Sequence, residues 1–167
     1  DPRLQGWLTG LWAFPNGLTQ QGTEAERKEV CLELQERLCA CVAGNLRDYE
    51  FEGRRGEAVA GRDAGWPGSN SAYAASPSET VNYASAHDNE TLWDTVALKV
   101  PRDMPLEERC RIHRLAVALV ALSQGVPFHH AGEELLRSKS LDRDSYNSGD
   151  WFNQLDFTCE TTNWGIG

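Results

Sequence analysis

One stretch decides the fold of this sequence, residues 81–93, which read Val-Asn-Tyr-Ala-Ser-Ala-His-Asp-Asn-Glu-Thr-Leu-Trp. The β-branched and aromatic residues at its start predict a short buried strand over 81–86. His87 and Asp88 follow, just before a short helix that we expect to start near Glu90. Because α/β proteins place their chemistry at the carboxyl ends of strands, these two side chains are candidates for recognising adjacent hydroxyls of a sugar. From the spacing alone, the alternative that Asp88 is the N-cap of the helix stays open.

The residues after this stretch predict a second strand parallel to the first. Pro101 ends the short helix, and a long helix is expected over about residues 105–124, with Asp103 as its cap. Its inner side is predicted from apolar residues at helical spacing, namely Ile112, Leu115, Ala116, Leu119 and Leu122. Gly125 ends the helix, and Val126-Pro127-Phe128 forms the next strand. The order strand, helix, strand predicts a βαβ unit of a parallel sheet.

The amino-terminal part predicts a long helix. Thr23-Glu24-Ala25-Glu26 has the pattern of a capping box, in which the threonine and the second glutamate satisfy free backbone amides. Apolar residues then follow at four-residue steps, namely Val30, Leu34, Leu38 and Val42. We therefore expect a helix over residues 24–44, with Gly44-Asn45 as its C-cap.

The segment 53–79 is rich in glycine, serine and proline and has little apolar periodicity. It predicts a long loop, of the kind that is usually functional or disordered. Within it, Trp66 and Tyr73 either stack on sugar rings or pin the loop to the body of the protein.

Three blocks of this sequence together resemble one enzyme family. They are residues 81–93, residues 122–139 with Gly132-Glu133-Glu134, and residues 140–153 with Asp142-Arg143-Asp144. In this order and spacing, the blocks resemble the α-amylase superfamily of glycoside hydrolases, in the form found in pullulanases and plant-type limit dextrinases. The amino-terminal part up to Tyr49 resembles the limit dextrinase pattern more loosely. The resemblance implies a starch-debranching enzyme.

The resemblance implies a fold as well as an activity. Enzymes of this superfamily have a catalytic (β/α)8 barrel, which typically needs about 250 residues, whereas this sequence has 167. The expected fold class is therefore α/β, as a partial (β/α)8 TIM barrel with about the last two to three βα units. Residues 1–167 form, on this expectation, the C-terminal part of the catalytic domain, with barrel strands 7 and 8 after a helical segment. Because the chain starts at Asp1 and has one methionine, Met104, we expect a fragment of a larger enzyme.

The resemblance also implies roles for particular residues. Asp88 corresponds to the family's third catalytic carboxylate, which stabilises a transition state with oxocarbenium character. His87 binds the same glucosyl unit, and the guanidinium of Arg143 binds donor-side glucose. Asp144 is a further expected substrate-binding residue. For Asp144 and its neighbour Asp142, a local salt-bridged turn is an alternative that stays open.

The family's nucleophile and general acid lie at the ends of the fourth and fifth barrel strands, so on the resemblance both precede this sequence. We therefore expect the chain alone to be inactive. The parent is expected to hydrolyse α-1,6-glucosidic branch linkages in pullulan, amylopectin and limit dextrins with retention of configuration. The expected partners are an α-glucan substrate and the remainder of the catalytic barrel.

Two other functions fit parts of the sequence. One is another α-glucan enzyme of the superfamily, such as an isoamylase, although the run 137–146 resembles the limit dextrinase group in particular. The other is a truncated, non-catalytic protein that binds α-glucans or has a regulatory role, which the missing nucleophile and acid favour. Product analysis on pullulan distinguishes the first, and an intact mass near 18.6 kDa for the native polypeptide favours the second.

No organic cofactor is predicted, and no metal site is recognised. His129 and Glu133 have the i, i+4 spacing of metal ligands, but the Gly-Glu-Glu segment resembles a loop-holding motif of the family. The acidic run from Asp142 fails as a calcium-binding EF-hand, since the glycine and glutamate positions hold Asn147 and Asn153. Calcium is common in the superfamily, so a calcium ion in the parent enzyme stays open.

Composition and charge narrow the class of partner. A net charge of −9 argues against nucleic acid and anionic membrane surfaces, and no apolar run has the length that a bilayer requires. The five cysteines have neither a disulfide nor a zinc pattern and predict small buried hydrophobes in a reducing compartment. The sequon Asn89-Glu90-Thr91, at the proposed site, also favours a non-secretory compartment. The resemblance to plant-type enzymes implies a plastid.

Overall fold

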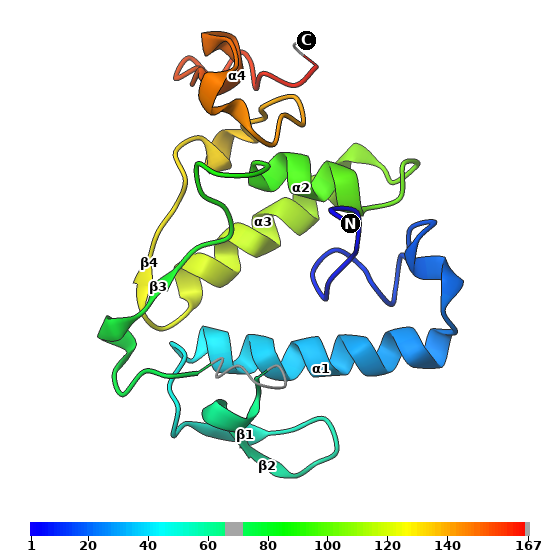
Figure 1. The fold of residues 1–167 in the computed structure, drawn as a ribbon, viewed down its shortest axis with the longest axis vertical. Helices are drawn as coiled ribbons and strands as arrows, with labels where there is room; N and C mark the ends of the chain where they lie inside the picture. Colours follow the sequence, from blue (N-terminus) through cyan, green and yellow to red (C-terminus); the bar gives the residue numbers. More distant parts are fainter. Residues whose placement is uncertain (66–71, 166–167) are drawn as a thin grey trace.

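Figure 1 shows the computed structural model of the chain, which describes residues 1–65 and 72–165. The helices are α1 (Glu24–Val42), α2 (Leu92–Lys99), α3 (Leu106–Leu122) and α4 (Asp150–Asn153). The strands are β1 (Glu50–Glu52), β2 (Ala58–Ala60), β3 (Val81–Asn82) and β4 (Val126–Pro127). Trp66, one of the two candidate sugar-stacking aromatics, lies outside the described residues. None of the described helices is both long and apolar enough to cross a membrane.

The strands β3 and β4 pair in parallel, with Val81 opposite Val126, and lie side by side in Figure 1. Because α2 and α3 connect them, this part of the chain forms the predicted βαβ unit. β3 is shorter than the predicted strand 81–86, and the prediction that it is buried is wrong. Val81 and Tyr83 are 57% and 60% exposed, because no described element covers this face of the two strands. Tyr83 packs edge-on against Phe128, with ring centroids 6.3 Å apart.

Gly125 shapes the turn from α3 into β4. Its φ is +111°, and a Cβ atom there would lie 2.7 Å from Thr80 Oγ1, so a larger residue would force the two segments apart. The backbone amide of Val126 donates to the Thr80 carbonyl over 2.9 Å, and Asn82 Nδ2 donates to the Gln124 carbonyl. The turn therefore sets the register of β4 against β3.

The buried face of α3 agrees only in part with the predicted one: Ala116 is buried and Ile112 and Leu119 are partly buried, as predicted. Leu115 and Leu122 are exposed, Leu122 to 83%, whereas the buried residues of this helix are His113, Ala116 and Val120. The ring of His113 accounts for the difference, because its Nε2 lies 2.7 Å from the Glu133 carbonyl oxygen and its edge meets Trp93 at 5.9 Å. A polar residue thus faces α2 where an all-apolar stripe was expected.

α1 begins as predicted, but it ends at Val42 with Ala43 as its C-cap, two residues before the predicted end. Thr23 Oγ1 accepts from the amide of Glu26 over 3.2 Å, and the Glu26 carboxylate accepts from the Thr23 amide over 2.8 Å, which completes the capping box. At the other end, Gly44 has a φ of +80°, and the amides of Gly44 and Asn45 donate back to carbonyls of the last turn.

At α3, a proline holds the N-cap position without a side-chain cap, so the prediction that Asp103 caps this helix is wrong.

The cysteines are only partly buried. All five are free thiols; Cys31 is buried on α1, whereas Cys41 and Cys159 are exposed. The prediction of small buried hydrophobes is therefore right for Cys31 and wrong for the two exposed thiols. Of the predicted apolar stripe of α1, Val30 is exposed, whereas Leu34, Leu38 and Val42 are partly buried.

A β-hairpin begins just before the segment 53–79, which was predicted as a loop, and its second strand lies within that segment. β1 and β2 pair antiparallel, with Phe51 opposite Val59, and both side chains pack on a small alanine core. Arg54, in the turn, reaches α1, where its guanidinium lies 3.1–3.2 Å from the carboxylates of Glu29, Glu33 and Glu36. These ion pairs order a segment whose own apolar pattern is weak, which is why the pattern did not predict strands there.

We expect Arg54→Met to loosen the hairpin from α1. The change removes three ion pairs around a guanidinium that is only 20% exposed and leaves their carboxylates without this partner. Local opening of residues 50–60 should become easier by about 1–3 kcal/mol. Amide hydrogen exchange of these residues, in the longest natural polypeptide that contains the chain, measures this change. Arg55→Met is the matched control, since that side chain is 75% exposed and 3.8 Å from its carboxylate; equal acceleration in both variants would contradict the prediction.

Candidate functional site

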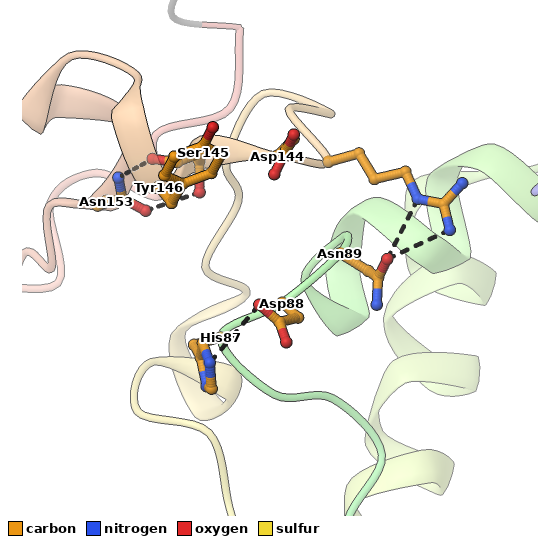
Figure 2. A pocket seen from close by; sticks show the side chains of 8 residues that line it. His87, Asp88, Asn89, Asp144, Ser145, Tyr146 and Asn153 are labelled. Carbon is orange, nitrogen blue, oxygen red and sulfur yellow. Dashed lines mark hydrogen bonds and ion pairs between the residues drawn. The ribbon is translucent and has the colours of Figure 1, made fainter.

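An open polar hollow brings together the bend between β3 and α2 and a segment near α4 (Figure 2). It has a volume of about 530 Å³. Its lining residues are His87, Asp88, Asn89, Arg143, Asp144, Ser145, Tyr146 and Asn153. All four of the site residues proposed from the sequence, His87, Asp88, Arg143 and Asp144, are among them. The structure therefore brings two distant parts of the sequence to one place, while the roles of the four residues stay predictions.

His87 and Asp88 project from the bend that follows β3. Their side chains are 88% and 80% exposed, and His87 Nε2 lies 3.5 Å from Asp88 Oδ1. The N-cap of α2 is Thr91, whose Oγ1 accepts from the backbone amide of Asp94 over 3.2 Å. The alternative in which Asp88 caps this helix is therefore wrong, and its carboxylate lines the hollow instead.

Arg143 joins the two segments of the site. Its Nε and Nη2 both donate to Asn89 Oδ1 over 3.2 Å, and its Nε also lies 3.6 Å from the carboxylate of Glu90. The arginine side chain is 60% exposed. Because a guanidinium carries five N–H donors in a fixed fork, the two bonds to Asn89 leave donors for a polar ligand in the hollow.

The turn around Asp142 is held by hydrogen bonds. Asp142 Oδ1 accepts from the amide of Asp144 over 2.9 Å, and its other oxygen accepts from the Ser148 hydroxyl. The bond from Ser148, together with the bond from the Asp144 amide, lowers the pKa of Asp142 below its ordinary value. Among the described residues, no ion pair joins Arg143 to either aspartate, so the alternative of a salt-bridged turn is wrong. The Asp144 carboxylate faces the hollow, as Figure 2 shows.

Sequence reasoning missed four residues of the hollow. Asn89 holds Arg143, and Ser145 and Asn153 exchange two hydrogen bonds of 2.8 Å that tie the 145–147 turn to α4. Tyr146 is exposed at the hollow, where its ring offers a face on which a sugar can stack. The one sequence feature that could have indicated Tyr146 as a site residue was its place within the block 140–153. Tyr73, the other candidate aromatic, is exposed and does not line this hollow.

Glu133 ties the loop after β4 to the segment after β3. Its carboxylate is buried, accepts from the Ser85 hydroxyl over 2.7 Å and lies 3.4 Å from His129 Nδ1. These contacts fit the loop-holding role that the Gly-Glu-Glu resemblance implies. In the part of the chain that the structure describes, no group of three or more acidic, histidine or cysteine side chains could hold a metal ion.

A polar hollow that follows the carboxyl end of a strand in a βαβ unit is the usual ligand site of α/β proteins. No protein-family model matches the chain. It is 49% identical over 167 residues to pullulanase 1, a chloroplastic protein of Arabidopsis thaliana, and 39% identical over 163 residues to the pullulanase of Klebsiella aerogenes. These alignments cover 99% and 98% of this chain but 17% and 14% of the relatives.

Solved structures give the same result. The crystal structure of Klebsiella pneumoniae pullulanase complexed with maltotriose matches with a TM-score of 0.90 and 38% identity, over 99% of this chain and 15% of that one. A mutant pullulanase of Paenibacillus barengoltzii complexed with maltotetraose matches 75% of this chain and 17% of that one, with a TM-score of 0.59 and 33% identity. Along nearly its whole length, the chain is thus similar to one segment of proteins named pullulanase. It spans about a sixth of the length of the curated relatives it matches.

Proposed function

We propose that this chain is a segment of a pullulanase-type debranching enzyme, a glycoside hydrolase that cleaves α-1,6-glucosidic branch linkages in pullulan, amylopectin and limit dextrins. One observation carries the proposal. His87, Asp88, Arg143 and Asp144 line one polar hollow, in a chain that is 49% identical to a pullulanase. That pullulanases have been solved with maltotriose supports an α-glucan as the ligand.

The geometry of the hollow supports a different role for each of these residues. The Asp88 carboxylate accepts the hydrogen bond of a sugar 2-hydroxyl, which strengthens as the ring acquires oxocarbenium character in a retaining mechanism. His87, beside it, binds the same glucosyl unit. Arg143 and Asp144, on the opposing segment, donate to and accept from hydroxyls of donor-side glucose. The nucleophile and general acid come from other parts of the parent enzyme, so this chain alone does not hydrolyse the substrate.

The fold proposal follows from the uncovered strands. Parallel sheets are normally covered on both faces, yet Val81 on β3, and Tyr83 and Phe128 directly after the two parallel strands, are all about half exposed or more. Leu122, at the end of α3, is also exposed. These apolar groups support a larger sheet in the parent, in which β3 and β4 are strands 7 and 8 of a (β/α)8 barrel and the remaining units cover them.

A plastid location is part of the proposal. It is supported by the chloroplastic Arabidopsis relative. The sequon at Asn89 agrees with a non-secretory compartment, since Asn89 lines the hollow and accepts from Arg143, where a glycan would meet an incoming substrate.

The test is the action of the longest natural polypeptide that contains this chain on pullulan. We expect maltotriose as the main product. Products of α-1,4 cleavage would move the assignment to another enzyme of the superfamily. No hydrolysis, together with a native mass near 18.6 kDa, would favour a truncated binding protein instead.

Arg143→Lys should raise the KM for pullulan about tenfold and change kcat much less, since a point charge replaces a planar fork of donors in a binding contact. Steady-state kinetics of the natural polypeptide measure both constants. Arg111→Lys is the matched control, because Arg111 on α3 is 59% exposed, against 60% for Arg143, and pairs only with neighbours on its own helix among the described residues. An unchanged KM in Arg143→Lys would contradict the binding role.

A further inference from the structure

A buried carboxylate organises the segment that leads to Arg143. Asp94, in the first turn of α2, has no exposed surface and accepts from the Ser138 hydroxyl over 2.5 Å, from the Lys139 amide over 2.8 Å and from the Leu141 amide over 3.3 Å. Ser140 and Leu141 have φ values of 50° and 67°, which residues other than glycine adopt rarely. The hydrogen bonds to Asp94 therefore hold this segment, and with it the direction in which the Lys139 side chain leaves the backbone.

Lys139 is the largest fully buried side chain of the described residues, with 1% of its surface exposed. Its ammonium donates to the backbone carbonyl of His87 over 3.2 Å. Buried lysines are rare unless they are paired. Burial lowers the pKa of Lys139, and the negative charges of Asp142, Asp94 and Asp88 act in the opposite direction. The lysine is thus placed against the peptide bond that joins His87 to Asp88.

The bend that Lys139 contacts is also held by Arg143, but only at Asn89 and Glu90, after His87 and Asp88. The bend at 86–90 lies outside any helix or strand, and Asn89 within it has a φ of 59°. The side chains of His87 and Asp88 are almost fully exposed, so packing does not orient them. Their directions therefore depend on the backbone of the bend, and Lys139 binds that backbone at the carbonyl directly before Asp88.

We infer that Lys139 is a positioning residue, which holds the His87–Asp88 peptide through its carbonyl and thereby aims the Asp88 carboxylate into the hollow. The inference rests on the proposed function of Asp88 in glycoside hydrolysis. Misplacement of a catalytic group by about 1 Å can cost about 100-fold in rate, so a buried hydrogen bond to the neighbouring carbonyl has a large effect on catalysis without any contact to substrate.

The test compares Lys139→Met with Lys99→Met in the longest natural polypeptide. Lys99, at the end of α2, is a matched control because its ammonium also donates to a backbone carbonyl, that of Leu4, and burial likewise lowers its pKa, but it lies outside the hollow. We expect Lys139→Met to lower kcat on pullulan about 100-fold with KM within about threefold. Lys99→Met should retain the wild-type kcat. Lys139→Arg, which keeps a cationic donor, should recover part of the loss.

One further measurement keeps the outcomes distinct. Amide hydrogen exchange at residues 86–90 should become faster in Lys139→Met and stay unchanged in Lys99→Met, and this result does not depend on activity. If Lys139→Met does not fold, Lys139→Gln takes its place. A folded Lys139 variant with wild-type kcat and wild-type exchange at 86–90 would overturn the inference. A wild-type polypeptide that releases no maltotriose would overturn the proposed function, while exchange at 86–90 would still decide whether Lys139 holds the bend.

Discussion

Asp88→Asn in the longest natural polypeptide that contains this chain is expected to lower kcat for maltotriose release from pullulan about 10³-fold, with KM changed little. The Asp88 side chain is largely exposed in the hollow and takes no part in capping α2, so the substitution removes charge without removing a helix cap. Asparagine keeps the size of the side chain. It cannot supply the negative charge that an oxocarbenium-like transition state needs, so the loss falls on the chemical step.

Steady-state kinetics with quantified maltotriose test this expectation. Asp103→Asn is the control, since Asp103 is an exposed aspartate in the turn before α3 and does not line the hollow. Full activity of Asp88→Asn would contradict the catalytic reading of Asp88. A comparable loss in Asp103→Asn would show that the assay reports the amount of folded protein and not the chemistry of the site.

Asp94→Asn should have the largest effect on local stability. The substitution places an amide nitrogen among hydrogen-bond donors and leaves the Ser138 hydroxyl or the amides of Lys139 and Leu141 without an acceptor in a buried place. A substitution that leaves a buried hydrogen-bonding group without its partner costs about 1–3 kcal/mol. Local opening of residues 138–142 should therefore become about 10- to 100-fold more frequent, at about 1.4 kcal/mol for each factor of ten.

Amide hydrogen exchange of the segment 138–142 measures this opening. Asp150→Asn is the matched control, because Asp150 occupies the first turn of α4 as Asp94 does in α2, but is exposed. Asp150→Asn removes a negative charge from the first turn of a helix without disturbing a buried network, so the two effects can be told apart. Unchanged protection of 138–142 in Asp94→Asn would show that the segment is held by other contacts.

The features that were predicted best from the sequence are those that depend on residues close together in the chain. The capping box of Thr23 and Glu26 is complete within four residues, and the structure has it. The alternation of strand and helix signals around 81–128 gave the βαβ unit. His87 and Asp88 are adjacent, and Arg143 and Asp144 are adjacent, so each pair was visible as a motif although their meeting in one hollow was not.

The features that the sequence did not predict are contacts between distant residues. Asp94 and Lys139 belong to different segments, and a hydrogen bond between a helix turn and a loop has no periodicity to detect. In α3, His113 is buried through its bond to the Glu133 carbonyl and its contact with Trp93, at a position that apolar spacing did not indicate. Arg54 ordered a hairpin through charges on another helix, where strand propensity was weak.

The exposed aromatic face of β3 and β4 has a practical consequence for anyone who produces this segment. Two short parallel strands with unpaired edges and exposed Tyr83 and Phe128 are a template onto which another copy can add its own strands. If the segment is made without the further barrel units proposed above, association should compete with folding and increase with concentration. Truncated forms of the parent should therefore end outside this unit. A boundary between α2 and β4 would leave an unpaired strand on each side.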